Sequence, residues 1–146
     1  MGYLIKPAGS DLVKIETLIS AGRMATLATL PQTIPTEKTG FVFMPVAAFI
    51  QVNGTTSYNT FNHLWLWQGG GAQKAATFGR VASNELEPGK CEAFIVNIDH
   101  GTTPTNKFGV SIAGNRDFTI EMDADDASGD GDGFVTIYGY YLPDFI

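Results

Sequence analysis

The most constraining feature of this sequence is an apolar run between Gly40 and Val52, GFVFMPVAAFIQV. From Phe41 to Ile50 no side chain is charged or forms hydrogen bonds, and most of these residues favour β-strands. Pro45 would cost a helix a hydrogen bond, and the run is shorter than the roughly 20 apolar residues that a membrane-spanning helix needs. The run therefore predicts a long central strand with a bulge at Pro45, and no association with a membrane.

Both faces of this expected strand are apolar. Phenylalanines alternate with mostly aliphatic residues, the two sets being Phe41, Phe43 and Phe49, and Val42, Met44, Val46, Ala48 and Ile50. The core of a β-sandwich buries only one face of a strand, so the other face needs a second layer or a neighbouring subunit. We therefore expect a symmetric homo-oligomer, with a homotrimer as the expected state.

The rest of the chain reads as short strands separated by turn signals, which is typical of a sandwich or barrel. The expected strands are Leu12–Ile19, Ala28–Ile34, Gly40–Val52, His63–Trp67, Ala75–Val81, Glu92–Asp99, Phe108–Ala113, Asp117–Asp123 and Phe134–Leu142. Ser20 is positioned to cap one short helical turn. We predict an all-β, single-domain sandwich of eight to nine strands, jelly-roll-like, with an immunoglobulin-like sandwich as the alternative. The domain would span residues 12–146, preceded by an N-terminal arm at residues 1–11.

Charge and composition narrow the range of functions. The 146 residues suit one domain, and the 16% of charged residues is low against a usual value of about 25%. The net charge of −6 argues against nucleic-acid binding, which needs a basic face. The N-terminal MGYLIK has neither the basic nor the apolar region of a signal peptide, so we expect a protein made and kept in a cytoplasm, or assembled there into a larger particle.

The loop Asp123–Gly133, DADDASGDGDG, partly matches a calcium-binding loop. Its alternating oxygen-bearing residues and its glycine have the required spacing, namely Asp126, Ser128, Asp130, Asp132 and Gly131. The twelfth position, which needs a bidentate Glu, is Ile137. We therefore expect a solvated hairpin loop without calcium, and no cofactor anywhere in the chain.

No catalytic motif is present. His63 and His100 are the only histidines, and neither lies in a nucleophile-elbow or HExxH context. Cys91 is the only cysteine, which excludes an intrachain disulfide and a zinc-type cysteine cluster. A cupin-like barrel enzyme would need clustered His and carboxylate ligands, so we predict a protein that is not an enzyme.

Two groups of apolar and aromatic residues are candidates for partner binding. Tyr3, Leu4 and Ile5 lie in the N-terminal arm, which would be ordered only when docked. Trp65 and Trp67 could join Tyr138, Tyr140 and Tyr141 in an aromatic platform for sugar, or pack within and between subunits. Exposure decides between these, because a flat, solvent-facing Trp pair favours sugar and a buried pair favours packing.

The layout of the sequence resembles small structural proteins of tailed-phage virions. The matching segments are KIETLISAGRMATLATLPQTIP at Lys14–Pro35, the apolar strand with its Asn53-Gly54 turn, Tyr58, and NRDFTIEMDADDASGDGDGFVTIYGYYLP at Asn115–Pro143. TNF-like and C1q-like trimers are more weakly similar.

The phage resemblance implies a β-sandwich subunit on the capsid surface, either a decoration (cement) protein or a head-fibre protein. It implies no enzyme activity, and we expect the major capsid protein as the partner. The alternative is a carbohydrate- or receptor-binding module of a virion fibre.

Overall fold

The computed structural model describes residues 11–68, 76–96 and 117–143, which form eight strands and one helical turn. The elements are β1 (Val13–Ile19), α1 (Ala21–Met24), β2 (Gln32–Ile34), β3 (Phe41–Val52), β4 (Leu64–Gln68), β5 (Ala76–Val81), β6 (Cys91–Val96), β7 (Phe118–Met122) and β8 (Gly133–Pro143). The predicted all-β single domain is thus confirmed. The ninth expected strand, Phe108–Ala113, and most of the arm lie outside the described residues.

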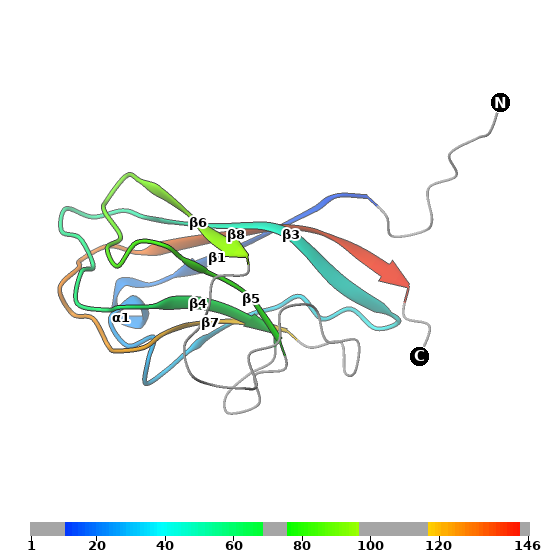
Figure 1. The fold of residues 1–146 in the computed structure, drawn as a ribbon, viewed down its shortest axis with the longest axis horizontal. Helices are drawn as coiled ribbons and strands as arrows, with labels where there is room; N and C mark the ends of the chain where they lie inside the picture. The colour runs from blue at the N-terminus through cyan, green and yellow to red at the C-terminus, as the bar shows by residue number, and fades with distance from the viewer. Residues whose placement is uncertain (1–10, 69–75, 97–116, 144–146) are drawn as a thin grey trace.

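All eight strands belong to one antiparallel sheet with the order β1-β8-β3-β6-β5-β4-β7-β2, nearly closed into a barrel. Figure 1 shows the two layers, with β1, β8, β3 and β6 above and β4, β5 and β7 below. The first strand pairs with the eighth, the second with the seventh, the third with the sixth and the fourth with the fifth. A long antiparallel ribbon rolled up on itself gives this nested pairing, which is the jelly-roll arrangement.

Local sequence signals explain how several elements begin and end. The Ser20 side chain accepts a hydrogen bond from the Arg23 N–H and so caps α1, as expected. The short strand β2 follows Pro31 and lies at one end of the strand order, which is where a proline is tolerated. Pro88 and Gly89 form a tight turn in which the Lys90 N–H donates to the Glu87 carbonyl and Gly89 has a φ of 78°.

The central strand β3 has the predicted bulge, but the bulge changes which side chains face the core. Val46 has no paired residue on β8, since Pro45 pairs with Gly139 and Ala47 with Tyr138. Phe43 before the bulge and Ile50 after it therefore face the same side and are both buried. The strict alternation expected from the sequence, which put Phe43 and Phe49 on one face, was wrong for this reason.

The core lies between the two layers and receives side chains from every strand. Aromatic rings of opposite layers meet there, with Phe43 of β3 edge-on to Phe118 of β7 at 6.0 Å between ring centres. Met24 of α1 and Leu27 close one end of the core and are fully buried. Burial of such side chains contributes roughly 1.5–3 kcal/mol each and is the main stabilising term of the fold.

Candidate functional site

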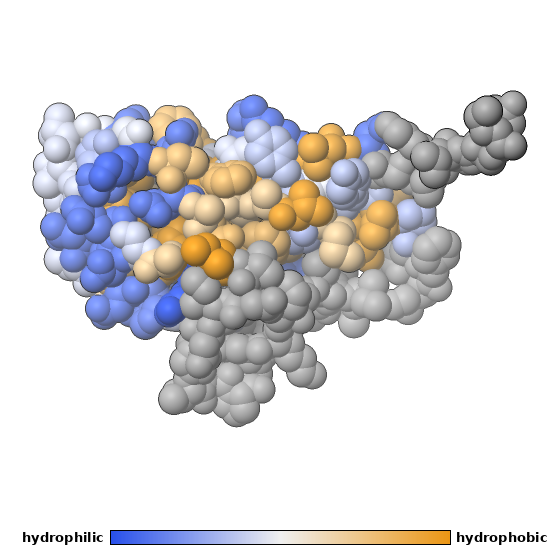
Figure 2. Space-filling view, turned by 45° about the horizontal axis from the view of Figure 1, so that its top comes forward, coloured by the Kyte–Doolittle hydropathy of each residue, from blue (hydrophilic) through white to orange (hydrophobic). Residues whose placement is uncertain are grey.

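The side of the β1–β8–β3–β6 layer that faces away from the core is largely apolar. Of eight large hydrophobic side chains exposed in the described residues, six belong to these strands: Leu18, Met44, Val46, Ile95, Phe134 and Leu142. We call the outward-facing residues of these four strands the apolar face. Figure 2 shows hydrophobic side chains gathered along the middle of this side, with hydrophilic residues at its left end.

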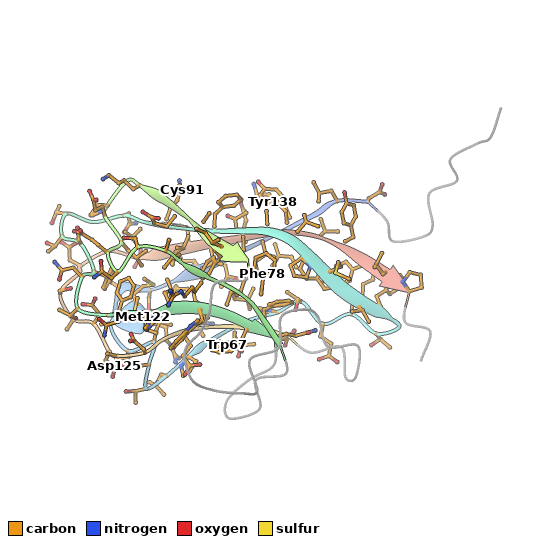
Figure 3. All side chains as sticks on the ribbon, in the orientation of Figure 1. Trp67, Phe78, Cys91, Met122, Asp125 and Tyr138 are labelled. Atoms are coloured by element: carbon orange, nitrogen blue, oxygen red, sulfur yellow. The ribbon has the colours of Figure 1, made fainter. Side chains whose placement is uncertain are left out.

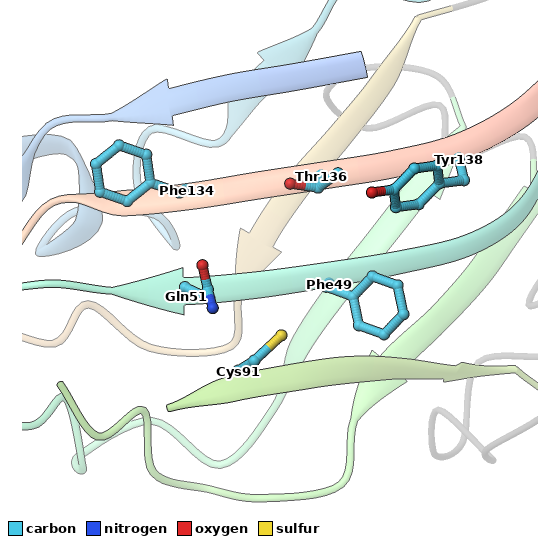
Figure 4. Close-up of a pocket in the computed structure, with 6 residues that line it drawn as sticks. All are labelled: Phe49, Gln51, Cys91, Phe134, Thr136 and Tyr138. Atoms are coloured by element: carbon cyan, nitrogen blue, oxygen red, sulfur yellow. The ribbon is translucent and has the colours of Figure 1, made fainter. Parts of the chain in front are cut away.

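Strand register sets the order of side chains across the apolar face. Phe134 of β8 pairs with Leu18 of β1 on one side and with Gln51 of β3 on the other, and Gln51 pairs with Cys91 of β6. The next row contains Phe49, whose ring meets that of Tyr138 edge-on at 6.4 Å. Between these rows lies a shallow hollow of about 240 Å³, lined by Phe49, Gln51, Cys91, Phe134, Thr136 and Tyr138 (Figure 4).

Charge is nearly absent from the apolar face. At outward positions of its four strands the only charged side chains are Lys14 and Glu16, which form an ion pair of 2.7 Å. The hydrogen bond and the negative charge of Glu16 raise the pKa of Lys14 above its ordinary value. The face can therefore form apolar contacts, and its two charged side chains are paired with each other.

The tryptophans proposed for partner binding lie on the opposite layer, on the outer side of β4. Leu64 and Leu66 enter the core, while the Trp65 ring stacks on His63 at 5.4 Å between ring centres. Trp67 is only 4% exposed, and its ring is tilted by 48° against that of Trp65. Figure 3 shows Trp67 on the lower layer and Tyr138 on the upper one. The described residues thus lack the flat, solvent-facing Trp pair that would favour a sugar platform.

The tyrosines of β8 are divided between its two sides and do not join the tryptophans. Tyr138 faces outward, whereas Tyr141 faces inward, lies 5.1 Å from the Phe43 ring and donates a hydrogen bond to the Thr36 carbonyl. Burial and the nearby Asp117 carboxylate raise the pKa of Tyr141. The five-residue aromatic platform considered from the sequence is therefore not assembled.

The acidic loop differs from the expected hairpin. It links β7 of one layer to β8 of the other, and these strands do not pair with each other. Its carboxylates accept hydrogen bonds from backbone N–H groups of other connections: Asp125 binds Ala28 and Thr29, Asp130 binds Thr55 and Thr56, Asp132 binds Ala21, and Asp123 binds Asn62 and His63. The loop holds the neighbouring loops in place and is not simply a solvated turn.

Asp126 is the most buried member of this loop, with 0% of its surface exposed. Its carboxylate accepts hydrogen bonds from the N–H groups of Thr60 at 2.7 Å, Phe61 at 3.2 Å and Ser128 at 2.9 Å, and from the Ser128 hydroxyl. Burial acts to raise the pKa of Asp126, but the hydrogen bonds from Ser128 and Thr60 outweigh it and lower the pKa. The folded protein therefore favours the charged form of Asp126.

Tyr58 packs directly against the acidic loop. Its side chain is fully buried, and its hydroxyl donates to the Gly131 carbonyl at 2.6 Å. Burial, followed by the charges of nearby loop carboxylates, raises the pKa of Tyr58 to about 12. A Cβ at Gly129 would lie 2.5 Å from the Tyr58 ring, and one at Gly131 would lie 1.8 Å from the Asn53 carbonyl oxygen. Three segments that were noted separately in the sequence therefore form one packed unit: Asn53-Gly54, Tyr58 and the Gly/Asp-rich loop.

The remaining candidates give no catalytic arrangement within the described ranges. His63 Nδ1 lies 3.2 Å from the Asp123 carboxylate, and no cluster of three or more metal-ligating side chains occurs in residues 11–68, 76–96 and 117–143. Nor does that part of the chain contain a helix that is long and apolar enough to cross a membrane. Tyr3, Leu4, Ile5 and His100 lie outside the described residues.

Neither the protein-family models nor the curated proteins that were searched contain a match to this sequence.

Sequence reasoning missed the role of the acidic loop, although a signal for it was present. Asp126 is followed two residues later by Ser128, a spacing that favours a side-chain hydrogen bond to the local backbone. The apolar face was anticipated from β3 alone. The apolar face extends over β8 and β6 because these strands lie on either side of β3, and this strand order could not be predicted from the sequence.

Proposed function

We propose that this protein is a non-enzymatic structural protein of a virus particle, a capsid decoration (cement) subunit that binds the major capsid protein and stabilises a phage head. The observation that carries the proposal is a single jelly-roll domain with an apolar face that has no charged side chain beyond one ion pair. The resemblance of the sequence layout to phage virion proteins supports the same function.

The mechanism would be the burial of surface area. A standard contact buries about 1,600 Å², and its repetition over a symmetric shell adds many moderate contacts. The subunit would act as a homo-oligomer, so that each oligomer carries several capsid-binding surfaces. Such a role requires a rigid domain, and the acidic loop supplies rigidity by joining the β1–β2 and β3–β4 connections.

The experiment is reconstitution on heads that lack this protein. Purified heads from a virus with the gene deleted would be mixed with the protein, and bound protein would be separated by sedimentation. We expect saturation at a fixed ratio to the major capsid protein, together with release of DNA at a higher temperature. Protein that stays at the top of the gradient at every concentration would overturn the capsid role.

A further inference from the structure

We propose that the apolar face is a self-association surface, which packs against the same face of a second copy of this chain. This inference rests on the proposed function in one respect, because it names the surface through which the proposed homo-oligomer forms, and its tests need no capsid. Monomeric proteins rarely expose contiguous apolar patches of more than a few hundred Å². Here the exposed side chains include Leu18 at 60%, Val46 at 52% and Phe134 at 44%, all on one layer.

The distribution of charge allows a second copy as the occupant. Five of the fifteen acidic residues lie in the Asp123–Gly133 loop, so the mutual repulsion of two copies, each with a net charge of −6, comes mainly from that connection. The apolar face adds little to it, because Lys14 and Glu16 neutralise each other and the acidic loop belongs to the connection between β7 and β8. Within the described ranges, and apart from residues around β1, the only other large hydrophobic side chain that is exposed is that of Leu30. The surface of this chain that can match the apolar face is therefore the apolar face itself.

The size of the face agrees with the needs of a stable dimer. Its four strands have 7, 11, 12 and 6 residues. At about 3.3 Å per residue and 4.8 Å between strands, they cover about 600 Å² in projection. Two such faces together reach the lower end of the range of about 1,200–2,000 Å² for specific interfaces, and side-chain relief increases the area.

The shape of the face favours the same partner. The face has both a hollow, lined by Phe49, Phe134 and Tyr138 among others, and projecting side chains such as Leu18 and Val46 (Figure 4). Two copies packed face to face would each supply projections for the hollow of the other. Contact between identical faces is two-fold, so it gives a dimer and not the homotrimer expected from the sequence.

The first test measures molar mass by light scattering on purified protein without any capsid. We expect twice 15.7 kDa for the wild type. Replacement of both Leu18 and Phe134 by Lys should raise the dissociation constant at least tenfold. The matched control is Leu30→Lys, which alters an equally exposed leucine, at 52%, that lies off the face. A wild-type monomer, a trimer, or a dimer that the double variant leaves intact would overturn the proposal.

The second test needs no substitution and so cannot fail through misfolding. Cys91 is exposed on the apolar face beside Gln51 and is the only cysteine of the chain. Its rate of reaction with a bulky maleimide should fall at least tenfold as protein concentration rises through the dimerisation range, and the labelled protein should be monomeric. A rate independent of concentration would overturn the proposal, whatever the outcome of capsid binding.

Discussion

At the scale of single residues, the loop between β7 and β8 shows how few positions fix the geometry of this protein. Its aspartates are acceptors for backbone N–H groups that no strand satisfies, and its glycines allow two chain segments to touch. Composition suggested a soluble, charged turn. The sequence could not reveal the role of these aspartates, because their partners lie about 60–110 residues away in the chain.

Gly131→Ala should destabilise the fold strongly, because the new Cβ would lie 1.8 Å from the Asn53 carbonyl oxygen. We expect a loss of about 3 kcal/mol in the free energy of unfolding, measured by urea titration. Gly22→Ala is the matched control, since no atom lies within 4 Å of its Cβ and the residue is helical. It should stabilise the protein by about 0.5–1 kcal/mol. Equal effects of both substitutions would contradict this account.

Stability should fall in acid through the loop carboxylates. The pKa values of Asp123, Asp125 and Asp126 are lowered, and hydrogen bonds from the Thr55 hydroxyl, then from the N–H groups of Thr56 and Thr55, lower the pKa of Asp130 to about 2. Groups with a lowered folded-state pKa stabilise the fold above their unfolded value of about 3.9, and this stabilisation is lost as protons bind at lower pH. Thermal melts should therefore show a falling melting temperature between about pH 4 and pH 2.

Asp126→Asn isolates the buried member of this group. It should cost roughly 1.5–3 kcal/mol at pH 7, because the amide accepts fewer of the hydrogen bonds that the carboxylate accepts. The gap from the wild type should narrow as the pH falls, since the wild-type carboxylate is then protonated too. Glu37→Gln, at an exposed site, removes the same charge and should leave the melting curve unchanged. A gap that stays constant with pH would assign the loss to packing alone.

At the scale of elements, strands were predictable and their faces were only partly so. The apolar run, Pro31 and the Ser20 cap correctly indicated β3, the edge strand β2 and α1. Pro45 correctly indicated where β3 bulges, but the expected faces of the strand were wrong, because strict alternation ignored that the extra residue of a bulge reverses which side chains face inward. Phe43 and Ile50 share the core for this reason, and the outward set is correspondingly different.

Deletion of Val46 should remove the bulge and restore regular pairing between β3 and β8. Pro45 and Ala47 would then pair with Gly139 and Tyr138 as they do now, and no inward residue would change sides. We expect a folded protein whose unfolding free energy changes by about 1 kcal/mol, measured by denaturant titration. Deletion of Thr136 from the regular partner strand is the control, and it should prevent folding because it turns half of β8 to the wrong face. A folded Thr136 deletion would show that register is not fixed here.

At the scale of the whole molecule, the jelly-roll order could be anticipated only as a class. Eight or nine strands with long connections favour it, but the nested pairing depends on contacts between the two ends of the chain. The aromatic candidates show the same limit. Trp67 and Tyr138 belong to opposite layers, and nothing in their spacing reveals this separation (Figure 3).

Removal of residues 1–11 should leave the domain folded and weaken attachment to heads. The first strand begins at Val13, so no described strand pairing is lost. Burial of Tyr3, Leu4 and Ile5 on a capsid or neighbouring subunit would contribute roughly 1.5–3 kcal/mol each before the cost of ordering the arm. Occupancy of undecorated heads at limiting concentration measures the effect. Equal occupancy of truncated and full-length protein would remove the arm from the attachment mechanism.

The pairing of β1 with β8 also determines when the sheet of this protein can form during synthesis. β8 lies between β1 and β3, so β1 has no strand partner and β3 keeps one unpaired edge until Gly133–Pro143 has left the ribosome. Folding that depends on such distant pairings is slow, and exposed apolar edges are prone to aggregate. A nascent chain of this protein therefore remains a candidate for chaperone binding until β8 has emerged and paired with β1 and β3.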